Sequence, residues 1–143
     1  MDNKITLIEN DITVEEYLSI RKKVNWRELT VRQAALAIEN SLHIVKAVDQ
    51  KQNLLGMGRI VGDGAVICYV QDLVVVPEAQ GKGIGTIILR HLTDYVSSIQ
   101  EQNTTMMFCL MSAKGREYFY EKHGFIARPT DELGPGMIQY LNK

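Results

Sequence analysis

The spacing of hydrophobic side chains along the chain changes several times, and each change marks a predicted element. From residue 4 to residue 9 apolar and polar side chains alternate, which is the two-residue period of a half-buried strand. Further apolar segments of strand character are separated by short polar turns or by glycine-containing turns such as residues 62–64. The sequence therefore predicts about seven strands, at residues 4–9, 43–49, 54–61, 65–76, 106–111, 125–128 and 137–141.

Four other segments have the three-to-four-residue period of amphipathic helices. The first begins with Thr13 and Glu16, and the second begins with Thr30 and Gln33. Each pair has the spacing of a capping box, in which the two side chains satisfy free backbone N–H groups at the helix start. Gly124 stands at the expected end of the last helix, where glycine is favoured. The predicted helices span residues 14–24, 31–38, 84–100 and 115–123.

These elements follow one another in the order β-α-α-β-β-β-α-β-α-β-β and account for the whole chain of 143 residues. No linker, repeat or low-complexity segment interrupts them. A chain of this length is large enough for one hydrophobic core but not for two. We therefore expect a single α/β (α+β) domain over residues 1–143, with a central, mostly antiparallel mixed sheet.

Charge and composition exclude several classes of partner. The 16 basic and 17 acidic residues give a net charge of -1, so no basic surface for nucleic acid or for an anionic membrane is expected. The near-neutral charge favours a small-molecule partner. No signal-peptide core and no membrane-spanning apolar segment is found, which favours a cytoplasmic protein. Cys68 and Cys109 lie in apolar segments and predict buried, reduced thiols. No metal site is expected, because the three histidines, His43, His91 and His123, lie on separate predicted elements.

The glycine-rich segment Gln80–Gly85 connects the longest predicted strand to the longest predicted helix. Glycines at alternate positions let successive backbone N–H groups point towards a ligand, and the helix start adds a positive end. This junction is therefore a predicted anion site that suits a diphosphate. It is not a P-loop, because no glycine of this segment is followed by Lys and then Ser or Thr. A Rossmann fingerprint fits poorly, because Thr86 stands where its third glycine would be.

The spacing Q/R-x-x-G-x-G/A of this loop, between a strand and a helix, resembles the pyrophosphate-binding loop of the GNAT family of acetyl-CoA-dependent N-acetyltransferases. The order of the elements is also similar to the GNAT topology. The resemblance implies acetyl-CoA as co-substrate and no metal. It further implies that backbone groups of the preceding strand hold the pantetheine arm and the thioester oxygen. The implied cofactor-binding residues are Leu73, Val74, Val75, Val76, Gln80, Gly81, Lys82, Gly83, Ile84, Gly85 and Thr86.

A second segment, Phe119–Phe125, resembles the F/L-Y-x-x-x-G-F motif near the C-terminus of GNAT chains. In that family the matching tyrosine faces the cofactor sulfur, which implies that Tyr120 protonates the leaving thiolate. A phenol of pKa about 10 is a suitable donor to a thiolate whose conjugate acid has a pKa of about 8.5. The alternative is that Tyr120 only packs among the aromatic side chains of a short helix. Many relatives have Asn where Ala113 stands here, and whether the adjacent Ser112 replaces it is open.

Asp72 is the one charged residue on an otherwise apolar strand face between Val66 and Val76. A carboxylate among apolar side chains is costly unless it is paired or used. One interpretation is a general base for the incoming ammonium, with a pKa raised by desolvation. The other is a structural role, in which Asp72 bonds loop amides or a tyrosine hydroxyl.

Trp26 and Glu28 lie in the connection between the first two predicted helices, which usually forms part of the substrate wall in this fold. An aromatic face beside a carboxylate suits a cationic amine. The more ordinary interpretation is that Trp26 covers the edge of the core and that Glu28 is solvated. The sequence predicts acetyl transfer to a primary amine of a small molecule by direct attack in a ternary complex. A protein lysine or N-terminal acetyltransferase and a non-catalytic acyl-CoA-binding module are the alternatives, and a monomer and a homodimer are both compatible.

Overall fold

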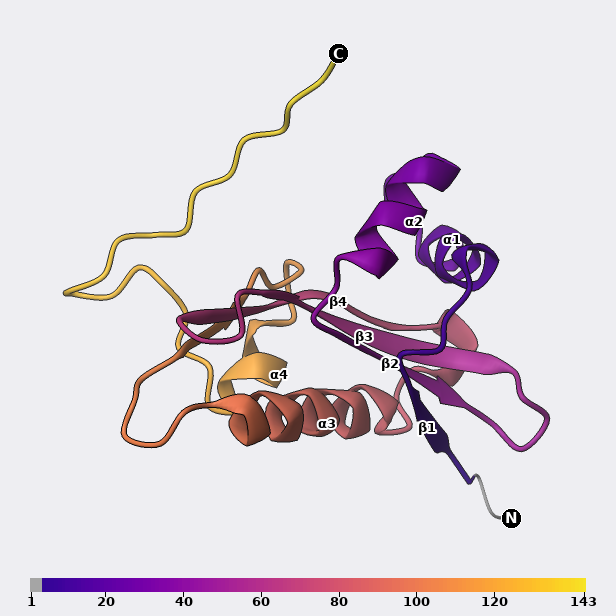
Figure 1. The fold of residues 1–143 in the computed structure, drawn as a ribbon, viewed down its shortest axis with the longest axis horizontal. Helices are drawn as coiled ribbons and strands as arrows, with labels where there is room; N and C mark the ends of the chain where they lie inside the picture. The colour runs from indigo at the N-terminus through magenta and orange to yellow at the C-terminus, as the bar shows by residue number, and fades with distance from the viewer. Residues whose placement is uncertain (1–3) are drawn as a thin grey trace. The chain divides into compact units, whose positions relative to one another are not determined.

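The computed structural model describes residues 4–143. The chain divides into two compact units, one ending at Phe108 and the other spanning Cys109–Lys143. The expectation of a single domain therefore stays a prediction. The elements, labelled in Figure 1, are β1 (Thr6–Glu9), α1 (Val14–Lys23), α2 (Val31–Glu39), β2 (His43–Val48), β3 (Leu54–Gly62), β4 (Ile67–Val75), the 3₁₀ helix η1 (Pro77–Ala79), α3 (Ile84–Ile99), β5 (Met107–Leu110) and α4 (Glu117–Glu121).

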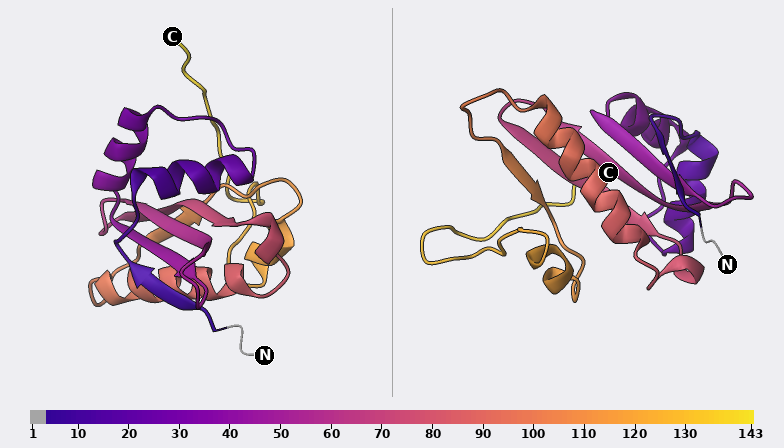
Figure 2. Two further views of the ribbon diagram at one scale, coloured as in Figure 1. Left: turned by 90° about the vertical axis from the view of Figure 1, so that its right-hand side faces the viewer. Right: turned by 90° about the horizontal axis from the view of Figure 1, so that it is seen from below.

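A five-stranded sheet in the order β1-β2-β3-β4-β5 forms the centre of the fold. The three pairings among the first four strands are all antiparallel. The short turns of the sequence predict this for β2-β3 and β3-β4, whereas α1 and α2 lie between β1 and β2. In the first unit α1 and α2 cover one face of the sheet and α3 covers the other (Figure 2). This α/β architecture and the four helices confirm the predicted fold class.

The two predicted capping boxes are present at the starts of α1 and α2. The Thr13 hydroxyl accepts the Glu16 N–H at 3.0 Å, and the Glu16 carboxylate accepts the Thr13 N–H at 3.0 Å. Thr30 and Gln33 form the same pair of bonds at 3.0 and 2.8 Å. Local sequence signals therefore set both helix starts, as expected.

Two glycines on β3 let α3 lie very close to the sheet. A Cβ atom on Gly56 would lie 2.8 Å from the Val74 carbonyl oxygen and 2.9 Å from the Ile88 Cδ1 atom. A Cβ atom on Gly58 would lie 2.7 Å from side-chain atoms of both Ile88 and Leu92. Both of these helix residues are fully buried. The absence of two side chains on the strand therefore fixes the distance between the helix and the sheet.

The Gly56→Ala variant is expected to lose about 1–3 kcal/mol of unfolding free energy, because the added methyl group overpacks a close contact with backbone. Urea unfolding of the full chain measures the loss. Gly134→Ala is the matched control, because a Cβ atom there meets no described atom within 4 Å and the residue has no positive φ. A Gly56→Ala variant as stable as the control would show that α3 adjusts without cost.

Strand β4 begins two residues later than predicted. The Asp63 carboxylate accepts the N–H groups of Ala65, Val66 and Ile67 at 2.8 to 3.0 Å, which holds residues 65 and 66 in a turn. Val66 is consequently 69% exposed and does not belong to the buried face on which the strand pattern placed it. From Cys68 to Val76 the even-numbered residues are buried, so the rest of the predicted alternation is confirmed.

In the second unit, α4 is shorter than the predicted helix 115–123, but Gly124 closes it as the sequence predicts. Gly124 has φ 93°, and its N–H donates to the Glu121 carbonyl at 3.0 Å. The Phe125 N–H reaches back to the Tyr120 carbonyl at 3.1 Å, which completes a Schellman motif. The Tyr120 ring packs edge-on against the rings of Phe119 and Phe125.

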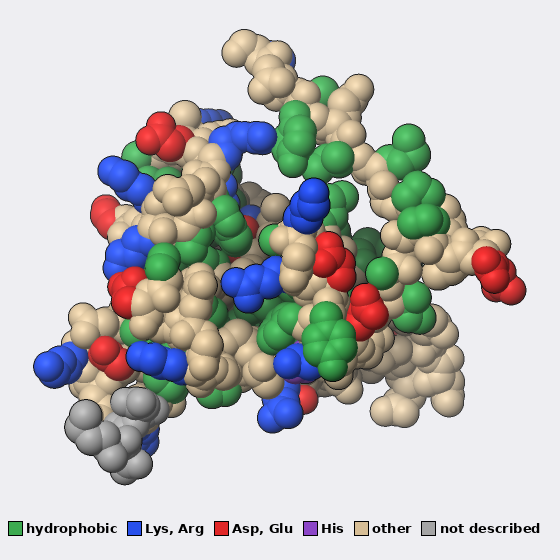
Figure 3. Space-filling view, turned by 180° about the vertical axis from the view of Figure 1, so that it is seen from behind, with side chains coloured by type: hydrophobic (Ala, Val, Ile, Leu, Met, Phe, Trp, Pro, Cys, Tyr) green, Lys and Arg blue, Asp and Glu red, His purple; other side chains and the backbone are tan. Residues whose placement is uncertain are grey.

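The two strands predicted after α4, at residues 125–128 and 137–141, are wrong. Residues 125–143 form no regular element, so the sheet has five strands where the sequence predicts seven. Alternating apolar residues make a strand only where another strand supplies backbone partners, and none of the described strands pairs with this segment. Apolar side chains lie exposed along it (Figure 3): Ile126, Met137, Ile138, Tyr140 and Leu141.

Candidate functional site

The glycine loop follows β4 after the short helix η1. The Gln80 side-chain amide donates to the Val75 carbonyl at 3.0 Å, so the start of the loop is tied back to the strand. Gly81 and Gly83 have φ values of 79° and 81°, a left-handed conformation that favours glycine over every other residue. The sequence of the loop therefore follows from its backbone geometry.

No side chain of residues 4–143 caps the start of α3, where Gly83 is the N-cap residue. A Cβ atom built on Gly81 or Gly83 meets no described atom within 4 Å, so the space in front of the loop is open. Free N–H groups and the positive end of a 16-residue helix favour an anion here. Lys82 is exposed beside it and, with Ile84, lines a hollow of about 410 Å³.

Asp72 is bonded inside a buried polar cluster. One carboxylate oxygen, Oδ2, accepts the Tyr17 hydroxyl at 2.6 Å and the Arg59 Nε–H at 2.6 Å. The other, Oδ1, lies 3.7 Å from a guanidinium nitrogen of Arg21. Only 2% of Asp72 is exposed. Burial, and then the neighbouring carboxylate, raise the pKa of Tyr17, which keeps its proton on the donor side of this bond.

The cluster joins three elements, because α1 supplies Tyr17 and Arg21, β3 supplies Arg59 and β4 supplies Asp72. Arg59 is the direct register partner of Asp72. The register then shifts, so that Gln71 is an extra residue on β4 and is exposed. The structural interpretation of Asp72 suggested a bond to a tyrosine hydroxyl, and this bond is present in the fold.

Trp26 also belongs to this neighbourhood. The Arg21 guanidinium carbon lies 5.3 Å from the centre of the Trp26 ring, and its Nη2 group donates to the Arg27 carbonyl at 2.9 Å. A cation of the chain itself thus occupies one face of the tryptophan, where the sequence suggested a substrate amine. Glu28 is exposed in the same connection.

Tyr120 belongs to the second unit, whereas the loop and Asp72 belong to the first. Burial raises the pKa of its hydroxyl above the ordinary value of 10.0, so the group is protonated at neutral pH. Ser112 donates its hydroxyl proton to the Ala113 carbonyl at 2.8 Å. At the end of β4 the burial of the side chains alternates. Leu73 and Val75 are half-buried, and Val74 and Val76 are buried.

Neither cysteine is in a disulfide, as predicted. Cys68 is buried, whereas Cys109 is half-buried, and burial raises the pKa of the Cys109 thiol. A raised thiol pKa works against a nucleophilic thiolate.

The three histidines lie in separate segments of the chain, as the sequence indicates, but the fold brings His43 and His91 together. Their Nε2 atoms lie 3.1 Å apart, and the Glu9 carboxylate lies beside both. Burial and His91 lower the pKa of His43, although Glu9 acts in the opposite direction. Sequence spacing gave no signal, because the two histidines are 48 residues apart and meet only through helix-to-sheet packing. The third, His123, bonds its Nδ1 group to the Phe119 carbonyl at 2.8 Å within α4 and its C-terminal turn.

A family model described as an acetyltransferase (GNAT) domain matches residues 39–127, which include β4, the glycine loop, α3 and α4. This chain belongs to the GNAT family of N-acetyltransferases. As a GNAT enzyme it has the fold class that the sequence predicts. The family generally uses acetyl-CoA as the acetyl donor. Within the described residues, no helix is both long and apolar enough to cross a membrane.

Similar structures and sequences support this membership. A probable acetyltransferase of unknown function from Staphylococcus aureus is 28% identical, with a TM-score of 0.82, over 96% of this chain and all of that one. A GNAT family acetyltransferase from Streptococcus pneumoniae is 26% identical, with a TM-score of 0.81, over 98% of this chain and all of that one. The uncharacterized N-acetyltransferase ycf52 of Pyropia yezoensis is 25% identical over 87% of this chain and 71% of its own length. The histone acetyltransferase TAP1 of Glycine max is 27% identical over 92% of this chain and 59% of its own length.

Proposed function

We propose that this GNAT enzyme transfers an acetyl group from acetyl-CoA to the primary amine of a small molecule, by direct attack in a ternary complex. The observation that carries the proposal is the uncapped, open start of α3 behind Gly81 and Gly83 in a chain of this family. Near-neutral charge, with 16 basic and 17 acidic residues, supports a small acceptor over a strongly charged macromolecule.

In this proposal the diphosphate of acetyl-CoA lies in front of the glycine loop. The backbone N–H groups of Ile84, Gly85 and Thr86 bind its oxygens, and Gln80 keeps the loop attached to β4. Lys82 adds a charge whose effect is small because the side chain is exposed. Backbone groups of residues 73–76 would hold the pantetheine arm, as the family resemblance implies.

The chemistry needs an amine nucleophile and a proton for the leaving thiolate. Acetyl-CoA supplies the thioester: the amine nitrogen bonds to its carbonyl carbon, the carbon–sulfur bond breaks, and the sulfur leaves with the electron pair. The incoming ammonium loses a proton to water before the attack, and the nitrogen loses a second proton to water after it. Tyr120 gives its hydroxyl proton to the sulfur, and water returns a proton to Tyr120. The raised pKa of Tyr120 supports this role, because the group is protonated before transfer. The raised pKa of Cys109 and the burial of Cys68 argue against a covalent acetyl-enzyme.

For Asp72 we propose the role of a positioning residue. Its carboxylate already bonds Tyr17 and Arg59, and its 2% exposure leaves little access for a substrate ammonium. Through Arg21 the carboxylate also orients Trp26, which keeps the proposed substrate wall in place. Trp26 and the exposed Glu28 remain the proposed acceptor contacts.

Acetylation of a protein amine is the second candidate, favoured by the 27% identity to a histone acetyltransferase. A screen of small amines and of lysine-containing and N-terminal peptides, with acetyl-CoA and detection of released thiol, separates the two. Turnover of small amines, well above that of every peptide, is the expected result. Turnover confined to peptides would show that the acceptor is a protein amine and not a small molecule. Acetyl-CoA binding without any turnover would favour a non-catalytic binding module.

The Gly83→Val variant is expected to weaken acetyl-CoA binding by about tenfold or more, which is about 1.4 kcal/mol or more. The branched side chain would project into the open space in front of the helix start and would strain a backbone at φ 81°. Calorimetry on the folded variant measures the affinity. Gly64→Val is the control. It imposes similar backbone strain at φ 73°, but Gly64 precedes the start of β4, whereas the glycine loop follows the end of this strand. Unchanged acetyl-CoA affinity in Gly83→Val would contradict the loop assignment.

A further inference from the structure

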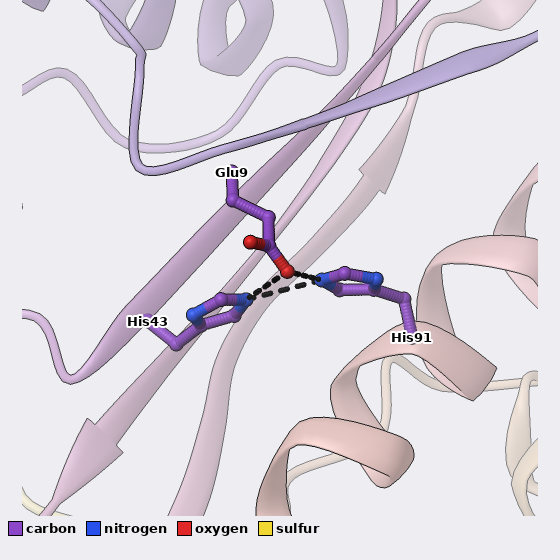
Figure 4. A group of neighbouring side chains, drawn as sticks. All are labelled: Glu9, His43 and His91. Atoms are coloured by element: carbon purple, nitrogen blue, oxygen red, sulfur yellow. Dashed lines mark hydrogen bonds and ion pairs between the residues drawn. The ribbon is translucent and has the colours of Figure 1, made fainter.

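Three side chains from separate elements of the first unit converge beside the sheet (Figure 4). Glu9 is the last residue of β1, His43 is the first residue of β2, and His91 lies on α3. The Nε2 atoms of the two histidines are 3.1 Å apart. Glu9 Oε1 lies 3.1 Å from the Nε2 atom of His91 and 3.7 Å from the Nε2 atom of His43. Two imidazole nitrogens and one carboxylate oxygen therefore face a common point.

The spacing of these three atoms matches that of ligands around a tetrahedral metal ion. Bonds of about 2.0 to 2.1 Å keep tetrahedral ligand atoms about 3.3 Å apart. The separations of 3.1, 3.1 and 3.7 Å also average about 3.3 Å. A point about 0.7 Å above the plane of the three atoms is about 2.05 Å from each of them, which is where a tetrahedral ion would lie.

Rigid parts of the fold hold the three side chains in place. The Asn10 N–H donates to the Ile44 carbonyl at 2.7 Å, and the Asn10 side chain accepts the Ile44 N–H at 2.9 Å. These two bonds fix Glu9 beside the start of β2. The His43 ring stacks on Tyr95 of α3, with ring centres 4.0 Å apart and planes 12° apart. The ligand atoms therefore need little ordering before an ion binds.

We propose that Glu9, His43 and His91 form a site for Zn²⁺ or a similar divalent transition metal, with three protein ligands. Imidazole nitrogens and a carboxylate suit Zn²⁺, whereas Mg²⁺ and Ca²⁺ prefer oxygen ligands alone and Cu⁺ prefers sulfur. His43 is buried, but Glu9 is 57% exposed, so the fourth position faces solvent and takes water. The site links β1, β2 and α3, and bound metal is expected to stabilise the first unit.

Titration with Zn²⁺ tests the proposal on the full, untagged chain after treatment with a chelator. Competition against a chromophoric chelator is expected to show one equivalent of Zn²⁺ bound per chain, and Zn²⁺ is expected to raise Tm. Glu9→Gln and His91→Gln should each lower the Zn²⁺ affinity by more than about 100-fold, since even outer-shell partners contribute roughly 10- to 100-fold. Thermal unfolding without metal verifies that both variants fold.

Two control variants separate this site from adventitious binding. His123→Gln removes the histidine that bonds within α4 and its C-terminal turn, and Cys109→Ser removes the half-buried thiol. Both should bind Zn²⁺ as the wild type does. The visible spectrum of the Co²⁺-loaded chain should have the strong bands of four-coordinate cobalt. Absence of saturable one-to-one binding at micromolar Zn²⁺, or binding unchanged in His91→Gln, would overturn the site and leave a network in which the two imidazoles share a proton.

Discussion

Replacing Tyr120 by Phe is expected to lower kcat by about 10² to 10⁴, the range typical of general acid catalysis. The substitution removes one oxygen and keeps the ring, so the edge-on packing against Phe119 and Phe125 should survive. Acetyl-CoA affinity should also survive, because the diphosphate is assigned to the loop. Steady-state rates with a confirmed acceptor, together with calorimetry, measure both quantities. Because burial raises the pKa of Tyr120 above 10.0, the wild-type rate should not fall through loss of this proton below pH 10.

Tyr118→Phe is the matched control for this experiment. Tyr118 lies on the same helix, α4, and is 76% exposed, so loss of its hydroxyl should leave kcat unchanged. A single-turnover measurement must first show that the chemical step limits the rate. If Tyr120→Phe then keeps more than about half of the wild-type kcat, Tyr120 is a packing residue and solvent supplies the proton.

Asp72→Asn is expected to cost about 3–5 kcal/mol of unfolding free energy, the range for removing one partner of a buried ion pair. The loss arises because Arg59, which is 7% exposed, and Arg21 would be left without their carboxylate. Urea unfolding measures the change. Asp94→Asn is the control, because Asp94 is an exposed aspartate on α3. The double variant Asp72→Leu with Arg59→Met should be less destabilised than the sum of its single variants.

The same Asp72 variant distinguishes positioning from proton transfer. A positioning residue loses stability, while the pH dependence of kcat/KM keeps its wild-type shape at a temperature where the variant is folded. A general base would instead lose the acidic limb of that profile. Wild-type stability combined with a lost limb would replace the positioning role by the catalytic one.

The parts of the fold that were predicted correctly depend on neighbouring residues in the sequence. The capping boxes at Thr13 and Thr30, the end of α4 at Gly124 and the glycine loop all involve backbone groups within about one helical turn. The wrong strands after α4 depend on a partner strand that the sequence pattern does not contain. The same holds for side-chain partners, since Asp72 bonds a tyrosine 55 residues away. The sequence suggested such a bond but could not indicate which tyrosine makes it.

Gly56 and Gly58 have a consequence for both proposed sites. They set the height of α3 above the sheet, and that helix carries the N–H groups proposed to bind the diphosphate at its start and His91 about two turns later. A side chain on either glycine would lift the helix and displace both groups of ligand atoms together. Acetyl-CoA affinity and zinc affinity are therefore expected to fall in parallel in β3 variants that touch neither ligand, because both sites depend on the position of α3 above the sheet.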